Sequence, residues 1–148
     1  EDEEDCVFNN DYKGLTIEWL KELNKSNFIW RNDLDQALIP IGQDTVFLSQ
    51  GGCDHFGIVV ELKLINDNHA ISDSVFWVHQ ALNLATEYKM DHYQKMIEVA
   101  KIRKAQDGET KVWYEVDDND PDDNLIYNGI EIKFEAASKR ISISQYYN

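Results

Sequence analysis

The sequence predicts one α+β domain, in which a mostly antiparallel sheet has about three helices packed on one face. Three observations lead to this fold class. Segments in which apolar and polar residues alternate, typical of half-buried antiparallel strands, lie in the first half and the last third of the chain. Other stretches carry apolar residues at helical spacing. Strands and helices are segregated along the chain, which makes a parallel βαβ architecture the less favoured alternative.

Length and composition fit a single folded unit. The 148 residues suit one domain, 1–148, and 43% of them are hydrophobic, with only two prolines, which predicts a packed core. Residues 1–13 precede the predicted elements and are expected to form a flexible acidic tail. The apolar runs fall short of the ~18 residues that cross a bilayer, so no membrane span is expected.

The first half of the chain should contain one helix and three strands. A helix is predicted over residues 16–25, because Thr16 can cap it and apolar side chains recur after it at helical spacing. Glycine-containing turns then separate three short segments of strand character. These strands are expected at residues 37–41, 45–49 and 56–65.

The second half should contain two helices and then a meander. Ser72 or Asp73 can cap a long helix through Ala85, and the spacing from Asp91 predicts a further helix to Lys104. Three strands are expected after it, at residues 111–116, 125–134 and 140–146. The Asn128–Gly129 pair is typical of a hairpin turn and could divide the second of these strands.

The two cysteines, Cys6 and Cys53, are widely spaced in the sequence. They lack the density of a disulfide scaffold and the paired spacing of a zinc site, so free thiols are favoured, although a single disulfide stays possible. Free thiols favour a cytoplasmic location. No signal peptide is visible in the sequence, but this does not decide the compartment.

The negative charge is concentrated in two short runs. Ten of the 28 acidic residues lie in residues 1–5 and 117–123, and without them the net charge would be -4 instead of -14. Such a balance disfavours contact with nucleic acid or anionic lipid and favours a basic partner protein. The partner-binding residues are predicted to be Asp117, Asp118, Asp120, Asp122 and Asp123, with Tyr114 and Tyr127 as aromatic anchors.

The second acidic run offers a weaker alternative, a calcium site. Counting from Asp120 as the first position, oxygen ligands would come from Asp120, Asp122, Asn124 and Glu131, with Glu131 at the twelfth position. However, Leu125 occupies the position that needs glycine in such a loop, and the flanks look like strands. No metal or other cofactor is therefore expected.

Recognisable catalytic motifs are missing from the sequence. The four histidines form no ligand pair on one element, and no nucleophile motif accompanies them. We therefore expect a non-catalytic acidic protein that inhibits a basic partner, of the type of an immunity protein that covers the cationic site of a nuclease-type bacterial toxin. The alternatives are a calcium-binding or surface accessory domain and a small hydrolytic enzyme.

Overall fold

The structure, a computed structural model, describes residues 6–98, 102–116 and 125–147. Its helices are α1 (Tyr12–Glu22), α2 (Ser74–Glu87) and α3 (Asp91–Glu98). The strands of the described residues are β1 (Ile29–Arg31), β2 (Gln36–Ile41), β3 (Asp44–Gly51), β4 (Phe56–Leu64), β5 (Ile102–Asp107), β6 (Lys111–Val116), β7 (Leu125–Phe134) and β8 (Lys139–Tyr147).

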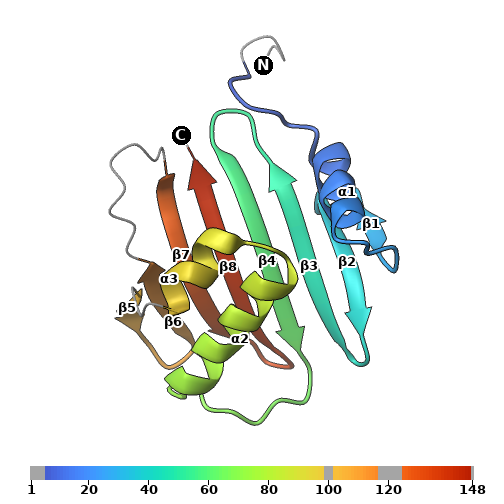
Figure 1. The fold of residues 1–148 in the computed structure, drawn as a ribbon. Helices are drawn as coiled ribbons and strands as arrows, with labels where there is room; N and C mark the ends of the chain where they lie inside the picture. The colour runs from blue at the N-terminus through green and yellow to red at the C-terminus, as the bar shows by residue number, and fades with distance from the viewer. Residues whose placement is uncertain (1–5, 99–101, 117–124, 148) are drawn as a thin grey trace.

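These strands form a single antiparallel sheet in the order β1-β2-β3-β4-β8-β7-β6-β5 (Figure 1). Two meanders, β1 to β4 and β5 to β8, meet where β4 pairs with β8, for example at Val60 opposite Ile143. All the pairings are antiparallel, which confirms the predicted class and rules out the parallel alternative. Figure 1 shows α2 and α3 in front of β7 and β8, and α1 in front of β2 and β3.

The core is formed by side chains of both the sheet and the helices. Alternate side chains of the central strands are buried, because a strand directs successive residues to opposite faces. The fully buried set includes Leu48, Val60, Ile132, Ile143 and, from α2, Trp77. A buried tyrosine of α3, Tyr93, donates its hydroxyl to the carbonyl oxygen of Gly129 at 2.6 Å, which fastens this helix to β7.

The first helix begins earlier than predicted. Asp11, not Thr16, caps α1, since its carboxylate accepts a hydrogen bond from the Gly14 amide at 3.0 Å. Thr16 is fully buried inside α1, and its hydroxyl oxygen accepts a hydrogen bond from the backbone amide of Gln50 at 3.1 Å. The helix ends before Lys25 because Asn24 takes a left-handed conformation, with φ of 57°, that closes it.

The helix predicted from Asp91 to Lys104 is too long. Within the described residues α3 ends at Glu98, and a strand, β5, begins at Ile102. Ile102 pairs with Val116 of β6, so sheet pairing outweighs the local helical pattern here. Arg103 and Lys104, at the end of the predicted helix, instead lie on the edge strand β5, where charge hinders pairing with other chains.

The other predicted elements are confirmed to within a few residues, including α2, which is capped by Asp73. The short strand β1 was not predicted, and β7 runs unbroken through Asn128 and Gly129. Gly129 is not a turn residue: a Cβ there would lie 1.7 Å from the Trp113 ring on β6. The glycine therefore makes room for an aromatic ring on the neighbouring strand.

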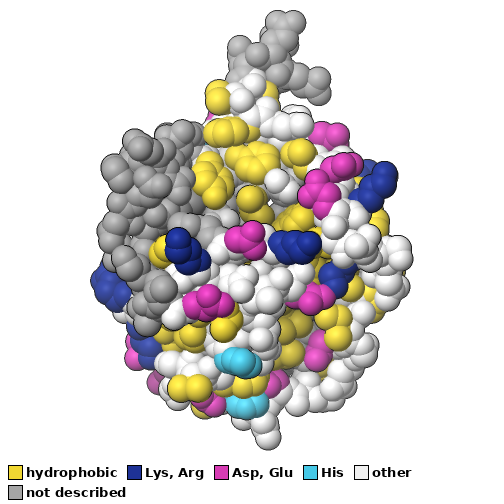
Figure 2. All heavy atoms as spheres, viewed as in Figure 1, with side chains coloured by type: hydrophobic (Ala, Val, Ile, Leu, Met, Phe, Trp, Pro, Cys, Tyr) yellow, Lys and Arg dark blue, Asp and Glu magenta, His cyan; other side chains and the backbone are white. Residues whose placement is uncertain are grey.

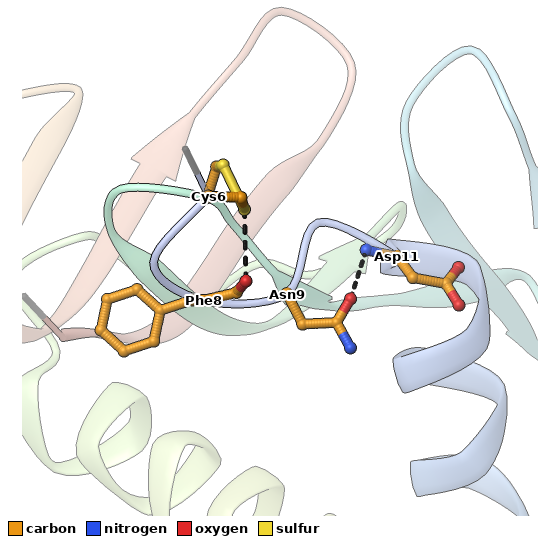
Figure 3. Close-up of a disulfide and its surroundings, with 5 residues drawn as sticks. Cys6, Phe8, Asn9 and Asp11 are labelled. Carbon is orange, nitrogen blue, oxygen red and sulfur yellow. Dashed lines mark hydrogen bonds between the residues drawn. A yellow bond between two sulfur atoms is a disulfide. The ribbon is translucent and has the colours of Figure 1, made fainter. Parts of the chain in front are cut away.

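The favoured interpretation of the cysteines is wrong, because Cys6 and Cys53 form a disulfide (Figure 3). The bridge ties the N-terminal segment to the turn between β3 and β4. The Phe8 amide also donates to the Cys53 carbonyl at 2.9 Å, and the Gly52 amide donates to the Asn9 carbonyl at 3.0 Å. From Cys6 onward, the segment assigned to a flexible tail is thus part of the folded body, while residues 1–5 lie outside the described part.

Among the described residues, none of the helices has the length and apolar character that crossing a membrane requires. The surface seen in Figure 2 carries interspersed acidic and basic side chains. Some charged side chains pair across neighbouring strands, as in the contact between Arg140 of β8 and Glu61 of β4 at 2.7 Å.

Candidate functional site

The predicted partner-binding loop lies outside the described residues, because Asp117, Asp118, Asp120, Asp122 and Asp123 all fall in the gap 117–124. Its two ends are described. β6 ends at Val116, β7 begins at Leu125, and these strands pair with each other. The acidic run therefore connects two neighbouring strands, as the sequence predicts.

The two predicted aromatic anchors have different positions. Tyr114 is only 4% exposed, and its hydroxyl donates to the Ser74 hydroxyl oxygen at 2.8 Å, so it joins β6 to α2 and cannot anchor a partner at the surface. Tyr127 lies in β7 opposite Tyr146, and its side chain is outside the described set. Strand alternation buries Tyr114 and places its neighbour Trp113 on the other face of the sheet, over Gly129.

The weaker calcium alternative gains no support. Asp120, Asp122 and Asn124 lie in the same gap, while Glu131 is on β7 with its carboxylate 3.3 Å from the ammonium of Lys111. In the part of the chain that the structure describes, no group of three or more metal-binding side chains occurs.

A different site emerges from the tertiary structure, a cleft of about 390 Å³ that we call the α1–α3 cleft. It is lined by Leu15, Glu18, Trp19, Glu22, Gln50, Ile58, Lys89, Met90, Asp91 and Gln145. Figure 2 shows hydrophobic side chains gathered between α1 and α3, next to acidic and basic ones. The volume lies within the range of small-molecule pockets.

Three adjacent strands provide one wall of the cleft. Gln50 of β3 pairs with Ile58 of β4, and Ile58 pairs with Gln145 of β8. Residues that face each other across neighbouring strands point to the same side of the sheet, so these three side chains form a row. The two ends of the row are amides and its centre is apolar.

One face of α1 provides the second wall. Leu15, Glu18, Trp19 and Glu22 recur three and four residues apart, which places them on the same side of a helix. The indole of Trp19 is held in place, since its nitrogen donates to the Tyr88 carbonyl at 3.2 Å. The apolar and the acidic residues of this face thus line the cleft together.

The turn between α2 and α3 provides the third wall. Lys89 adopts a left-handed conformation with φ of 53°, and the Met90 amide donates to the Ala85 carbonyl at 2.8 Å. This pattern closes α2 and directs Lys89, Met90 and Asp91 to the cleft. The preceding Tyr88 is buried, and its burial together with the charge of Glu87 raises its pKa to about 12.

The charges of the cleft are unbalanced. Its lining contains three acids, Glu18, Glu22 and Asp91, and one base, Lys89. Within the described residues none of these four groups forms an ion pair. Gln145 is 4% exposed, and its side-chain nitrogen has no hydrogen-bond partner among the described residues. The cleft can therefore accept positive charge and donate a hydrogen bond.

A second polar cluster, between β4 and α2, is satisfied internally. The carboxylate of Asp67 accepts from the His69 amide at 2.8 Å and lies 2.9 Å from the ring nitrogen Nδ1 of His69. Lys139 reaches the same carboxylate at 3.4 Å and donates to the His69 carbonyl at 2.7 Å. Burial opposes ionisation of Asp67, but the contacts with His69 and Lys139 outweigh it and lower the pKa. These contacts hold the loop between β4 and α2 together.

Comparison with known proteins identifies no relative, because no protein-family model, curated protein or solved structure matches the chain. The cleft was not foreseen from the sequence. The spacing of Leu15, Glu18, Trp19 and Glu22 was visible there, but α1 was predicted to start at Thr16, which excluded Leu15. The pairing of β4 with β8, which brings Gln145 to the cleft, leaves no local signal.

Proposed function

We propose that this chain is a non-catalytic acidic protein that binds and inhibits a basic partner protein. The partner we infer is a nuclease-type bacterial toxin, whose cationic site the chain would cover in the manner of an immunity protein. Phosphate-binding sites of nucleases are cationic, so a dense group of carboxylates can occupy them and speed association by electrostatic steering. The absence of catalytic activity stays a prediction.

The observation that carries the proposal is the place of the acidic run in the fold. Five carboxylates lie in the seven residues 117–123, which connect the paired strands β6 and β7. A connection between neighbouring strands has both ends attached to the sheet, so its charges are presented from one place on the molecule. Acids also outnumber bases in the described part, which adds to the negative field.

Two further expectations belong to the proposal. We take the three helices to pack as one layer on a single face of the sheet. The hydrogen bonds from the Gln50 backbone amide to Thr16, from Tyr114 to Ser74 and from Tyr93 to Gly129 support this arrangement.

The cytoplasmic location also stays a prediction, and the disulfide weighs against it because cytosolic reductants keep thiols reduced. An oxidising compartment agrees better with the bridge.

The test needs a basic nuclease-type protein encoded beside the gene for this chain, and the lack of such a neighbour would itself count against the proposal. The nuclease activity of that protein is measured with and without one molar equivalent of the chain, and the association rate is measured at low and high salt. We expect loss of nuclease activity and an association rate that falls as salt rises. An unaffected nuclease at equimolar chain would refute the inhibitor function.

A pair of double variants separates the loop from general acidity. Asp117→Asn with Asp118→Asn should slow association with the partner, because rim charges act mainly on the association rate. Asp33→Asn with Asp35→Asn removes the same charge from the turn between β1 and β2 and should leave the rate nearly unchanged. Equal slowing by both variants would show that the loop is not the interface.

A further inference from the structure

We propose that the α1–α3 cleft is a binding site for a small organic cation that also carries a hydrogen-bond acceptor next to an apolar or aromatic body. Amino acid amides and related amines have this chemistry. The site uses none of the acids of residues 117–123, so the inference does not depend on the proposed inhibitor function.

The need for an acceptor comes from Gln145. Its side chain is 4% exposed and belongs to the cleft lining, yet its amide nitrogen has no partner in the described residues. Buried polar groups in native proteins are nearly always hydrogen-bonded, so such an exception needs an explanation. A ligand oxygen in the cleft would supply the missing acceptor.

The need for a positive charge comes from the carboxylates. Glu18 and Glu22 lie four residues apart on one face of α1, and Asp91 lies across the cleft at the start of α3. These three acids lack ion-pair partners among the described residues, although the fold pairs many of its other charges, as at Lys25 and Glu87. Among the lining residues, three carboxylates would attract a cation between α1 and α3, and one base, Lys89, would oppose it.

The apolar side chains of the cleft favour a ligand with an apolar or aromatic body. Leu15, Trp19, Ile58 and Met90 line the cleft, and the hydrogen bond from Trp19 to the Tyr88 carbonyl fixes its indole before a ligand arrives. A ring can pack against the indole, and an ammonium near it gains cation–π attraction. Pockets with apolar walls and a few placed polar groups are typical of small-molecule sites.

Three small molecules test separately whether the cleft needs the positive charge and the hydrogen-bond acceptor of the ligand. L-phenylalaninamide has the cation, the acceptor and the ring; phenethylamine lacks the acceptor; N-acetyl-L-phenylalaninamide lacks the cation. Binding to the full chain is measured by NMR chemical-shift titration. We expect saturable binding of L-phenylalaninamide at the cleft residues, about tenfold tighter than either other probe. No saturable shift at these residues, or equal affinities for the three probes, would overturn the proposal.

Variants assign each preference to its residue. Gln145→Leu should remove the advantage of L-phenylalaninamide over phenethylamine, and Glu18→Gln with Glu22→Gln should reduce its advantage over the uncharged probe about tenfold. Glu109→Gln with Asp35→Asn, two exposed acids outside the cleft, is the control for loss of two charges and should bind as the wild type does. If Gln145→Leu does not fold, the probe comparison on the wild-type chain still decides. Preferences that persist unchanged in folded variants would overturn the assignment.

Discussion

The contact between Trp113 and Gly129 gives the sharpest test of the packing on the sheet. A Cβ at Gly129 would lie 1.7 Å from Cη2 and 2.0 Å from Cζ2 of the Trp113 ring. Carbon atoms in contact normally stay about 3.5 to 4 Å apart, so Gly129→Ala must displace the ring by roughly 2 Å. The backbone φ angle of Gly129 is not positive, so the backbone conformation itself accepts alanine.

The size of the effect follows from this overlap. Overpacking of a well-filled site costs about 1 to 3 kcal/mol, which is the destabilisation expected for Gly129→Ala in the wild-type chain. In a Trp113→Ala background the ring is gone, and alanine in a strand interior should be more stable than glycine by about 0.5 to 1 kcal/mol. The effect of the same substitution should therefore change sign.

The assay is a double-mutant cycle by urea unfolding, followed by circular dichroism so that the loss of a tryptophan does not affect the signal. The coupling between the two positions should be about 1.5 to 4 kcal/mol. If Gly129→Ala destabilises the chain equally with and without Trp113, then the ring does not occupy the space over Gly129 and the packing argument fails.

Three further measurements test the bridge and the two perturbed groups. Replacing Cys6 and Cys53 by serine removes a cross-link between residues separated by 47 positions, which should cost about 4 kcal/mol of unfolding free energy; an unchanged urea midpoint would contradict this. Asp67→Asn should destabilise the chain near neutral pH and weaken its acid sensitivity. The folded-state pKa of Asp67 is lowered, so its stabilisation exists above the unfolded pKa and is lost as pH falls through the folded pKa; equal acid sensitivity of both proteins would argue against it. The ultraviolet titration difference between wild type and Tyr88→Phe should show one phenol ionising near pH 12, whereas ionisation near the usual value of about 10 would disprove its burial.

The elements with regular local patterns were the predictable part of this fold. β4 alternates apolar and charged residues, as strands do when successive side chains point to opposite faces of a sheet, and α2 shows a long apolar stripe behind a capping aspartate. Both signals come from residues close together in the sequence. The same is true of the acidic connection between β6 and β7.

Predictions failed where distant residues compete with a local pattern. Residues 102–104 continue the spacing of a helix, yet Ile102 gains more from pairing with Val116. Thr16 has the chemistry of a cap, but its hydroxyl binds the Gln50 amide of β3 instead. The cysteines looked unpaired because 47 positions separate them, and only the fold brings their Cα atoms to 4.7 Å.

By itself the sequence determined that this protein is an acidic α+β domain with an antiparallel sheet, because charge and alternation are local properties. Only the tertiary structure decided that Glu18 and Trp19 of α1, Asp91 of α3 and Gln145 of β8 line one cleft. The physical reason is the pairing of β4 with β8, which joins the two halves of the chain through backbone hydrogen bonds. Such bonds are alike for all residue types, so the side chains of either strand do not reveal their partner.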